Sequence, residues 1–298
     1  IPIELNDNQS TKYTGIAIEQ IIANNLTMLF PGMSVKEHSF FRVTRDADLE
    51  LRDIEADDLM SALEEGLRKR RKGGEVVRLE VSKNTPKIIL DLLQEGMNIE
   101  RENLYQIEGL LALDELIELT HFNLPKLKFT EHQGITHTSL KNSQLREQDD
   151  VDTRNKANFK SIFSIIRRND LLVHHPYNLF STSVEECINQ AAEDQQVMGI
   201  KMTLYRISKD SLIIDALIRA SEKGKQVMAL VELKARFDED NNIQWAKRLE
   251  QSGVHVVYGV IGLKTHTKIA LIIRKEKNRL RTYFHIGTGN YNSKTSKT

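Results

Sequence analysis

Between residues 197 and 258 the chain alternates short apolar segments with amphipathic ones at a regular spacing. The apolar segments have the length and composition of buried strands, and the intervening segments have helical periodicity. This alternation predicts a mostly parallel α/β sheet with right-handed crossovers, because neighbouring parallel strands need a long return connection. The predicted order is strand 197–205, helix 210–223, strand 226–233, helix 241–251 and strand 254–258.

Two further apolar segments, 266–273 and 280–286, are predicted to form a hairpin around the charged run 274–279. In a strand, His266 and Lys268 would project from the same side. A lone His-x-Lys in a strand is more often structural. Here, however, the second strand leads into Gly287-Thr288-Gly289-Asn290, where glycine permits close backbone approach and free N–H groups can hold an anion. An imidazole nucleophile, a nearby cation and an anion cradle together favour phosphoryl transfer through a phosphohistidine.

Arginine follows two of the predicted parallel strands, as Arg206 after the first and Arg236 after the second. In sheets of this kind, ligands bind beyond the carboxyl ends of the strands. Either arginine alone could form a surface salt bridge, for instance Arg236 with Asp238 or Glu239. Their equivalent places in successive strand–helix units favour a shared pocket with His266, since the arginine fork suits phosphate oxygens.

The first half of the chain has weaker patterns and indicates a small α+β unit of β-α-β-α type. Residues 126 to about 155 are polar, so we expect a domain boundary near 150, with domains 1–150 and 151–298. A basic cluster at 68–72 closes one helix; it suits a solvated helix end, and contact with a polyanion is the alternative. The predicted elements are helix 15–30, strand 39–44, helix 57–71, strand 75–81, helix 87–94, an extended piece 104–106 and helix 110–119.

Composition narrows the class of protein. The chain has 298 residues, 42 Lys plus Arg and 42 Asp plus Glu, so its net charge of zero argues against a general nucleic-acid binder. Its single cysteine, Cys187, excludes an intrachain disulfide framework and favours a reducing compartment. No apolar run approaches the roughly 20 residues of a membrane span. The first residue is not Met, and we expect a fragment of a longer protein.

Taken together, these segments resemble the bacterial polyphosphate kinases of the first type, whose C-terminal domains are similar to the phospholipase D superfamily. The resemblance covers nearly all of 151–298, and more weakly 1–150, which would be most of an α+β head domain similar to PX modules. It rests on five segments in order: Leu171 to Tyr177, Leu204 to Arg206 with Lys209 to Ser211, Val231 to Asp238, Gly262 to Lys268 and His285 to Asn292.

The resemblance implies a role for each candidate residue. His266 would attack the γ-phosphate of ATP and pass the phosphoryl group reversibly to polyphosphate. Arg206 and Arg236 match positions that the family associates with Mg²⁺; an arginine has no lone pair to give, so we expect both to bind the phosphate oxygens around the ion. Lys268 and Asn290 would stabilise the transferring phosphoryl group. Lys264, Gly287, Thr288 and Gly289 would bind phosphate or ATP.

The chain departs from these patterns in two ways. The phospholipase D pattern would place Asp at 273, where this chain has Ile273, which favours the kinase over a phosphodiesterase. The resemblance also implies a second histidine half-site in a further domain, so we expect this chain alone to be inactive. The implied partners are ATP, ADP, inorganic polyphosphate and further copies of the chain, as a dimer or tetramer, without nucleic acid or a transmembrane segment. The implied location is cytoplasmic, with membrane association left open.

Two other functions stay open at this point. One is a phospholipase D-like phosphodiesterase or phosphatidyltransferase in which His266 attacks a diester. The other is a non-catalytic fragment that binds polyanions or mediates oligomerisation through residues 1–150. Labelled lipid or nucleic acid in place of ATP would distinguish the first from a kinase. Polyphosphate binding to 1–150, lost on neutralising Arg68 to Lys72, would support the second.

Overall fold

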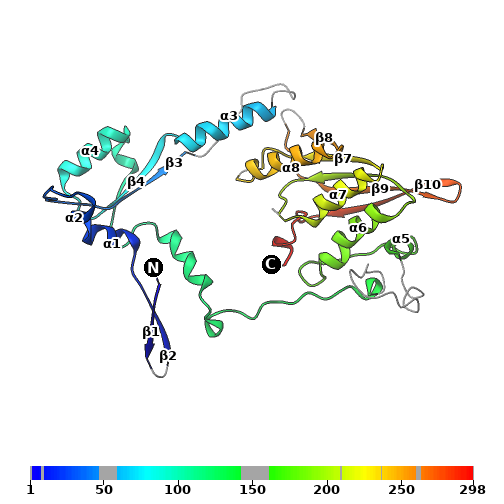
Figure 1. Ribbon diagram of the computed structural model, residues 1–298, viewed down its shortest axis with the longest axis horizontal. Coiled ribbons are helices and arrows are strands. Elements are labelled where there is room, and N and C mark those ends of the chain that lie inside the picture. The colour runs from blue at the N-terminus through cyan, green and yellow to red at the C-terminus, as the bar shows by residue number, and fades with distance from the viewer. Residues whose placement is uncertain are drawn as a thin grey trace. The chain divides into compact units, whose positions relative to one another are not determined.

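A computed structural model describes residues 2–7, 10–46, 59–141, 161–208, 210–235, 237–259 and 263–297 (Figure 1). The chain divides into two compact units: Ile1–Asp48 with Lys69–Pro125, and Leu49–Arg68 with Lys126–Thr298. The boundary predicted near residue 150 falls in 142–160, outside the described residues. The strands and helices of each unit follow the hydrophobic pattern of the sequence closely enough to place the candidate residues.

The first unit is built on a three-stranded sheet in the order β3-β4-β5. Strand β4 runs antiparallel to β3 and parallel to β5. The small core of this unit is formed by Leu79 and Val81, alternate residues of β4 that face one side of the sheet, together with Ile99, which follows α4. The strands are β3 Phe41–Arg45, β4 Val76–Ser82 and β5 Leu104–Ile107.

The helices of the first unit lie close to their predicted places. Helix α4 follows Pro86 and ends at Asn98, whose left-handed backbone lets its N–H reach the last carbonyls of the helix. The prediction for 110–119 was wrong in type, since this segment is a 3₁₀ helix, Leu113–His121. The hairpin of β1 Pro2–Asp7 and β2 Ser10–Gly15 was not anticipated. The remaining helices are α1 Ile18–Asn24, α2 Leu26–Leu29, α4 Lys87–Met97 and the 3₁₀ turns Arg101–Asn103 and Pro125–Leu127.

The second unit is built on a five-stranded sheet in the order β10-β9-β6-β7-β8 (Figure 1). Strands β6, β7 and β8 are parallel, β9 is antiparallel to β6, and β10 is antiparallel to β9. The expectation of a mostly parallel sheet is therefore corrected to a mixed sheet, because the predicted hairpin joins it beside β6. The strands are β6 Val197–Leu204, β7 Gln226–Val231, β8 His255–Tyr258, β9 Lys268–Glu276 and β10 Arg279–Gly287.

Helices α6, α7 and α8 pack side by side against this sheet. Helix α7 is capped by Ser211, whose Oγ accepts the N–H of Ile214, and it buries one apolar face. Helix α3, Leu59–Lys72, contributes Leu59, Leu63 and Leu67 to the same core. The other helical segments are α5 Ile162–Ile166, a π-helical turn Ser181–Glu185, α6 Glu186–Glu193, α7 Leu212–Glu222, α8 Glu239–Gln251 and the 3₁₀ turns Thr138–Leu140 and Thr295–Lys297. Within the described residues, no helix combines the length and the apolar composition needed to cross a membrane.

Candidate phosphoryl-transfer site

One edge of the five-stranded sheet collects the predicted site residues. The carboxyl ends of the parallel strands β6, β7 and β8 lie at this edge. Strand β9 runs the opposite way, so it begins here at Lys268, and β10 turns again and ends here at Gly287. The loops after β6, β7 and β10 and the loop before β9 therefore leave the sheet at the same edge, where ligands bind in α/β sheets.

The aromatic ring of Tyr205 lies at the centre of this edge. The imidazole of His266 packs against it edge to face, with ring centroids 5.2 Å apart. Around the same ring lie the Nζ atom of Lys268 at 5.1 Å, the Cζ atom of Arg206 at 5.6 Å and the Nζ atom of Lys264 at 5.9 Å from the centroid. One ring thus brings together four residues that the sequence had placed at the site.

His266 and Lys268 differ in their surroundings, which corrects the expectation that both project from a strand. Strand β9 begins at Lys268, so His266 lies in the preceding loop, where its side chain is exposed. Lys268 is only 3% exposed and donates a hydrogen bond from Nζ to the carbonyl oxygen of His266 at 2.7 Å. Burial lowers the pKa of the Lys268 ammonium below its ordinary value, because the charged form has lost water. The arrangement joins an accessible imidazole to a desolvated cation.

Sequence reasoning missed Glu232, which fixes the loop that carries His266. Its side chain is 2% exposed, and its two oxygens accept the backbone N–H groups of Thr265 at 2.6 Å and of Lys234 at 2.9 Å. A buried carboxylate between two loops holds them together, because each N–H would otherwise be unsatisfied. Only the position of Glu232, directly after a buried strand, could have indicated this role.

Sequence reasoning also missed Asn242. It is fully buried in α8, and its Nδ2 donates to the carbonyl oxygens of Tyr205 at 2.6 Å and Glu232 at 2.9 Å. These carbonyls follow β6 and β7, so a single amide ties together the two loops that carry the ring and the carboxylate. The sequence pattern shows Asn242 only as a polar residue in a helix.

Arg206 is partly exposed and pairs with Asp238, whose carboxylate lies 2.9 Å from the guanidinium. The backbone carbonyl of Arg206 also accepts a hydrogen bond from Nδ2 of Asn292 at 3.3 Å, which brings the segment after β10 next to the loop after β6. Arg236, the second predicted arginine, lies outside the described residues. A salt bridge between Arg236 and Asp238 had been the alternative at the sequence level; the structure pairs Asp238 with Arg206.

A contact between His285 and Tyr291 joins the two ends of the glycine-rich segment at the end of β10. Nδ1 of His285 lies 2.9 Å from the hydroxyl of Tyr291, which is 3% exposed. Burial, with a smaller contribution from His175, lowers the pKa of His285 to about 4, so this imidazole is neutral at neutral pH. A side chain at Gly287 would come within 3.0 Å of the His285 ring, which accounts for glycine there.

Two predicted residues of this segment, Thr288 and Gly289, are exposed, while Asn290 is half-buried. The Oδ1 atom of Asn290 is buried and has no hydrogen-bond partner among the described residues. A buried amide oxygen without a partner costs free energy and needs an explanation. A donor brought by a ligand, or a proton on a bound phosphate, would supply one.

The described residues contain no group of three or more His, Cys, Asp or Glu side chains that could hold a metal ion. Both oxygens of Glu232 already accept backbone N–H groups, and an arginine cannot coordinate a cation. An Mg²⁺ ion at this edge would therefore be held mainly by the phosphate oxygens of a ligand. Chemically, the edge suits an anion presented to the His266 imidazole.

Comparison with known proteins identifies the family of this chain. The sequence model of the polyphosphate kinase middle domain matches residues 1–119, and that of the polyphosphate kinase C-terminal domain 1 matches residues 161–298. Polyphosphate kinases of Parasynechococcus marenigrum and Prochlorococcus marinus are 65% and 64% identical over all 298 residues. The crystal structure of polyphosphate kinase from Porphyromonas gingivalis matches 98% of the chain with a TM-score of 0.71 and 28% identity.

The chain spans 42% of the length of the two curated relatives and 39% of the chain in the crystal structure. Two family models match in the order expected for one protein, and the high identity extends over every residue. The chain therefore belongs to the polyphosphate kinase family.

Proposed function

We propose that this chain supplies the nucleophile of a polyphosphate kinase, in which His266 accepts the γ-phosphoryl group of ATP and passes it reversibly to inorganic polyphosphate. The observation that supports this most directly is the exposed His266 imidazole beside three cationic side chains grouped around Tyr205. Positive side chains fixed around the imidazole would stabilise the negative charge of a phosphoryl group as it is transferred to the imidazole.

In the first half-reaction, an unprotonated ring nitrogen of His266 forms a bond to the γ-phosphorus as the bond from that phosphorus to the ADP oxygen breaks. In the second, a terminal oxygen of polyphosphate attacks the same phosphorus and the nitrogen–phosphorus bond breaks. Both steps run through a transition state with charge spread over the phosphoryl oxygens. The catalytic contribution of the protein is therefore mainly positioning and charge stabilisation.

The surrounding residues divide this work. The Lys268 ammonium, held at the backbone of His266, stabilises the oxygens of the transferring group. Arg206 and Lys264 hold the phosphates of the nucleotide or the polymer, and we assign Arg236 the same task. The backbone N–H groups of Gly287, Thr288 and Gly289 and the amide of Asn290 form an anion cradle. Mg²⁺ bound to the phosphates would neutralise part of their charge.

The wider assignment follows from the family. We assign the first unit to a PX-like head domain, the second to a phospholipase D-like catalytic domain, and the assembly to a homo-oligomer. The additional length of the relatives would supply a second histidine half-site, so the 298 residues alone would not sustain turnover. We place the protein in the cytoplasm, with membrane association as an optional state.

Donor specificity tests this assignment against the phosphodiesterase. Ile273 is half-buried in β9, where the phosphodiesterase pattern would place a carboxylate. A protein carrying these 298 residues is incubated with ATP, a phospholipid or an oligonucleotide, with and without polyphosphate. We expect polyphosphate-dependent formation of ADP and no diester cleavage. Diester cleavage without ADP formation would overturn the assignment. Sustained polyphosphate synthesis by the isolated chain would overturn the half-site proposal alone.

A further inference from the structure

The end of the β9–β10 hairpin, at the opposite edge of the sheet from His266, is strongly basic. Residues 274–281 contain five Lys or Arg side chains and one acid, Glu276. In the hairpin register, Arg281 lies opposite Arg274 and Arg279 opposite Glu276, and directly paired residues of antiparallel strands share a face. These four side chains therefore project from one side of the sheet.

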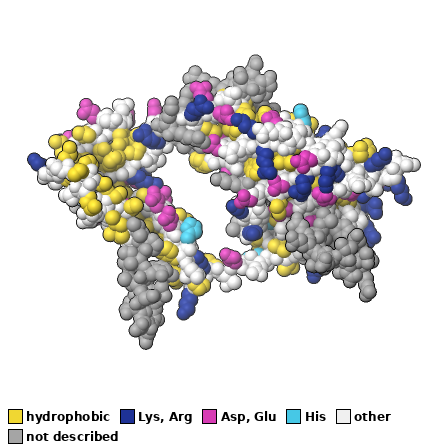
Figure 2. Space-filling view, viewed as in Figure 1, with side chains coloured by type: hydrophobic (Ala, Val, Ile, Leu, Met, Phe, Trp, Pro, Cys, Tyr) yellow, Lys and Arg dark blue, Asp and Glu magenta, His cyan; other side chains and the backbone are white. Residues whose placement is uncertain are grey.

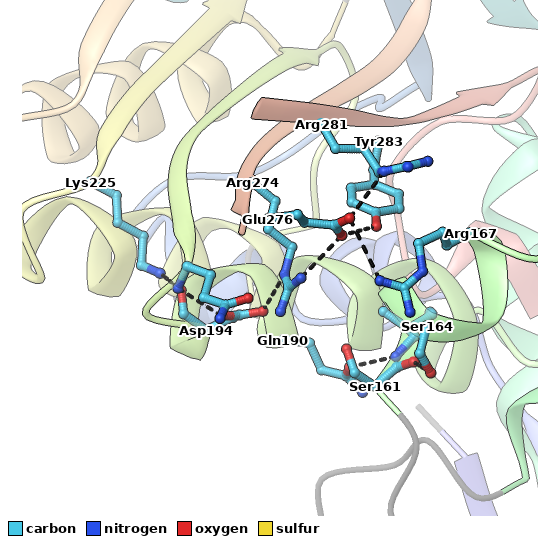
Figure 3. A network of polar contacts seen from close by, with 12 residues as sticks. Ser161, Ser164, Arg167, Gln190, Asp194, Lys225, Arg274, Glu276, Arg281 and Tyr283 are labelled. Carbon is cyan, nitrogen blue, oxygen red and sulfur yellow. Dashed lines mark hydrogen bonds and ion pairs between the residues drawn. The ribbon is translucent and has the colours of Figure 1, made fainter. Parts of the chain in front are cut away.

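Three arginines converge on the Glu276 carboxylate (Figure 3). The guanidinium of Arg281 lies 3.0 Å from it, that of Arg274 lies 3.1 Å away, and that of Arg167, which follows α5, lies 3.6 Å away. The Tyr283 hydroxyl also donates to the carboxylate. This network fixes the arginines in place, yet each guanidinium has more N–H donors than one carboxylate can fill.

The hairpin end keeps a surplus of accessible positive charge. The side chain of Arg167 is 46% exposed and that of Arg281 is 33% exposed. Beside them, Arg168, Lys275, Lys277 and Arg279 are exposed and form no ion pair with any residue in the described ranges. Figure 2 shows Lys and Arg side chains gathered where the hairpin projects from the sheet. We name Arg167, Arg168, Lys277, Arg279 and Arg281 the hairpin cluster.

The hairpin cluster is too far from His266 to share a small ligand with it. Strand β9 has nine residues between the two edges, which at about 3.3 Å per residue is a distance of roughly 30 Å. A nucleotide cannot contact both places. A long linear polyanion can contact both. When one of its ends lies at the edge that carries His266, which we call the reactive edge, the rest of the polymer is long enough to reach the hairpin cluster.

We propose that the hairpin cluster is a second binding site for a linear phosphate polymer, and that it holds the distal part of the polyphosphate whose end lies at His266. That this polymer is polyphosphate rests on the proposed function of the chain. Arginine forks match phosphate oxygens, and the Glu276 network pre-orders two of them. A single-stranded nucleic acid is disfavoured because its binding sites present aromatic rings for stacking, whereas residues 274–281 contain none.

The consequence is retention of the growing polymer between rounds of transfer. A polymer held at two places has a high effective concentration at the second place once the first is bound. Short phosphates, which reach only one place, gain nothing. The hairpin cluster therefore affects long-chain binding and product length, and it leaves formation of phosphohistidine on His266 unchanged.

The test compares two double variants with the same loss of charge. Lys277→Asn with Arg279→Gln removes two exposed charges of the cluster, and Asn tolerates the left-handed backbone at 277. The control with the same loss of charge is Lys223→Gln, directly after α7, with Arg248→Gln on α8; unlike the hairpin pair, these side chains form ion pairs, with Glu193 and Asp215. Binding of long-chain polyphosphate and of tripolyphosphate is measured by calorimetry over a range of salt concentrations.

We expect the hairpin variant to bind long chains at least about tenfold more weakly at low salt, with a salt slope smaller by roughly one to two, since each lost phosphate contact removes about 0.7 to 0.9. Tripolyphosphate binding should be unchanged, as should both ligands with the control. Long-chain binding equal to that of the parent, an equal loss in the control, or tighter binding of oligonucleotide or anionic vesicles than of polyphosphate would overturn the proposal.

Phosphohistidine formation is measured on the same preparations, so that the two proposals fail separately. Normal label on His266 with unchanged long-chain binding in the hairpin variant would refute only the second site. Absence of label in the parent, with long-chain binding still lost in the hairpin variant, would refute the transfer function and leave a polyphosphate-binding surface.

Discussion

The two edges of the five-stranded sheet are both basic, but they hold their charge in opposite ways. At the hairpin edge, burial tends to lower the pKa of Arg274, but Asp194 and Glu276 together outweigh it, so that the pKa is raised (Figure 3). At the reactive edge, Lys268 is buried against an aromatic ring and a carbonyl oxygen, and its pKa is lowered. The first arrangement stabilises the fold. In the second, the buried Lys268 ammonium forms no ion pair with a described residue.

Because of this difference, we expect substitutions at the two edges to affect activity and stability differently. A variant that removes the Lys268 charge should lose activity and keep or gain stability, because a buried, desolvated charge opposes folding. A variant in the Glu276 network should lose stability and keep activity. Functional sites commonly show this conflict between stability and activity.

The largest effect is expected from Lys268→Met, which removes the cation and keeps most of the side-chain volume. Phosphohistidine formation should fall about 10²- to 10³-fold, the usual cost of one preorganised charge or donor in the transition state. The thermal unfolding midpoint at neutral pH should stay level or rise. A drop in stability with activity retained would reverse the comparison.

The lowered pKa of Lys268 also predicts how stability and transfer rate change with pH. Because burial lowers the folded-state pKa of Lys268, the unfolded chain binds this proton more tightly, and stability rises with pH between the folded value and the ordinary value of 10.5. Transfer needs the ammonium form, so its rate should fall on the alkaline side below pH 10.5, and Lys268→Met should lack this limb. Rate profiles of the parent and the variant check the prediction.

Glu232→Gln should have the next largest effect. The amide can accept only one of the two backbone N–H groups and presents its own NH₂ to the other. We expect phosphohistidine formation to slow by up to about 10²-fold, since a small displacement of a reacting group can cost that much. The free energy of unfolding should fall by about 1–3 kcal/mol. An unchanged rate in a destabilised variant would show that Glu232 only supports the fold.

Substitution of Tyr205 should lower the rate of phosphohistidine formation less, and only when the aromatic ring is removed. Tyr205→Phe keeps the face on which the cations and His266 pack, and should transfer at nearly the parental rate. Tyr205→Leu should lower the rate about tenfold, given cation–π energies of about 0.5–2 kcal/mol. Rates at saturating ATP separate this from a change in KM. Equal loss in both variants would assign the effect to the hydroxyl.

The smallest effect on activity is expected from Glu276→Gln. The arginines lose their shared anion, and the free energy of unfolding should fall by about 1–3 kcal/mol. The hydrogen bond from Tyr283, followed by the arginine contacts, lowers the pKa of Glu276, so its contribution to stability is present above the unfolded value of about 4.5 and is lost as pH falls through the lower folded value. Unfolding measured at pH 7 and at pH 3 should therefore show a larger difference from the parent at pH 7 than at pH 3. Slower phosphohistidine formation would contradict the separation of the two edges.

The sequence predicted most of this second unit because its strands and helices have strong, regular patterns. The strand order of 197–258 and the hairpin of β9 and β10 were confirmed. The start of β9 was placed two residues early, because Thr267 and His266 continue the strand-like pattern into a loop that Glu232 holds. Local pattern cannot show a tertiary hydrogen bond of this kind.

Residues that organise the site without reacting were the ones missed. Asn242 lies in an amphipathic helix and Tyr291 in a polar loop, and neither position has a pattern that indicates its partner. In the first unit, the strongly periodic strand β4 and helix α4 were predicted well, whereas the hairpin of β1 and β2 has too little apolar alternation to be recognised. Short-range signals therefore place elements better than they place the side chains that join them.

The most direct measurement maps the phosphoryl group on the protein. A protein carrying these residues is incubated with γ-labelled ATP and Mg²⁺, quenched in alkali and digested, beside His266→Ala and a control, His255→Ala, which changes an exposed histidine of β8. We predict an alkali-stable, acid-labile label on the peptide that contains His266, present in the control and absent in His266→Ala. Label on another residue, or full activity in His266→Ala, would contradict the assignment of His266 as the nucleophile.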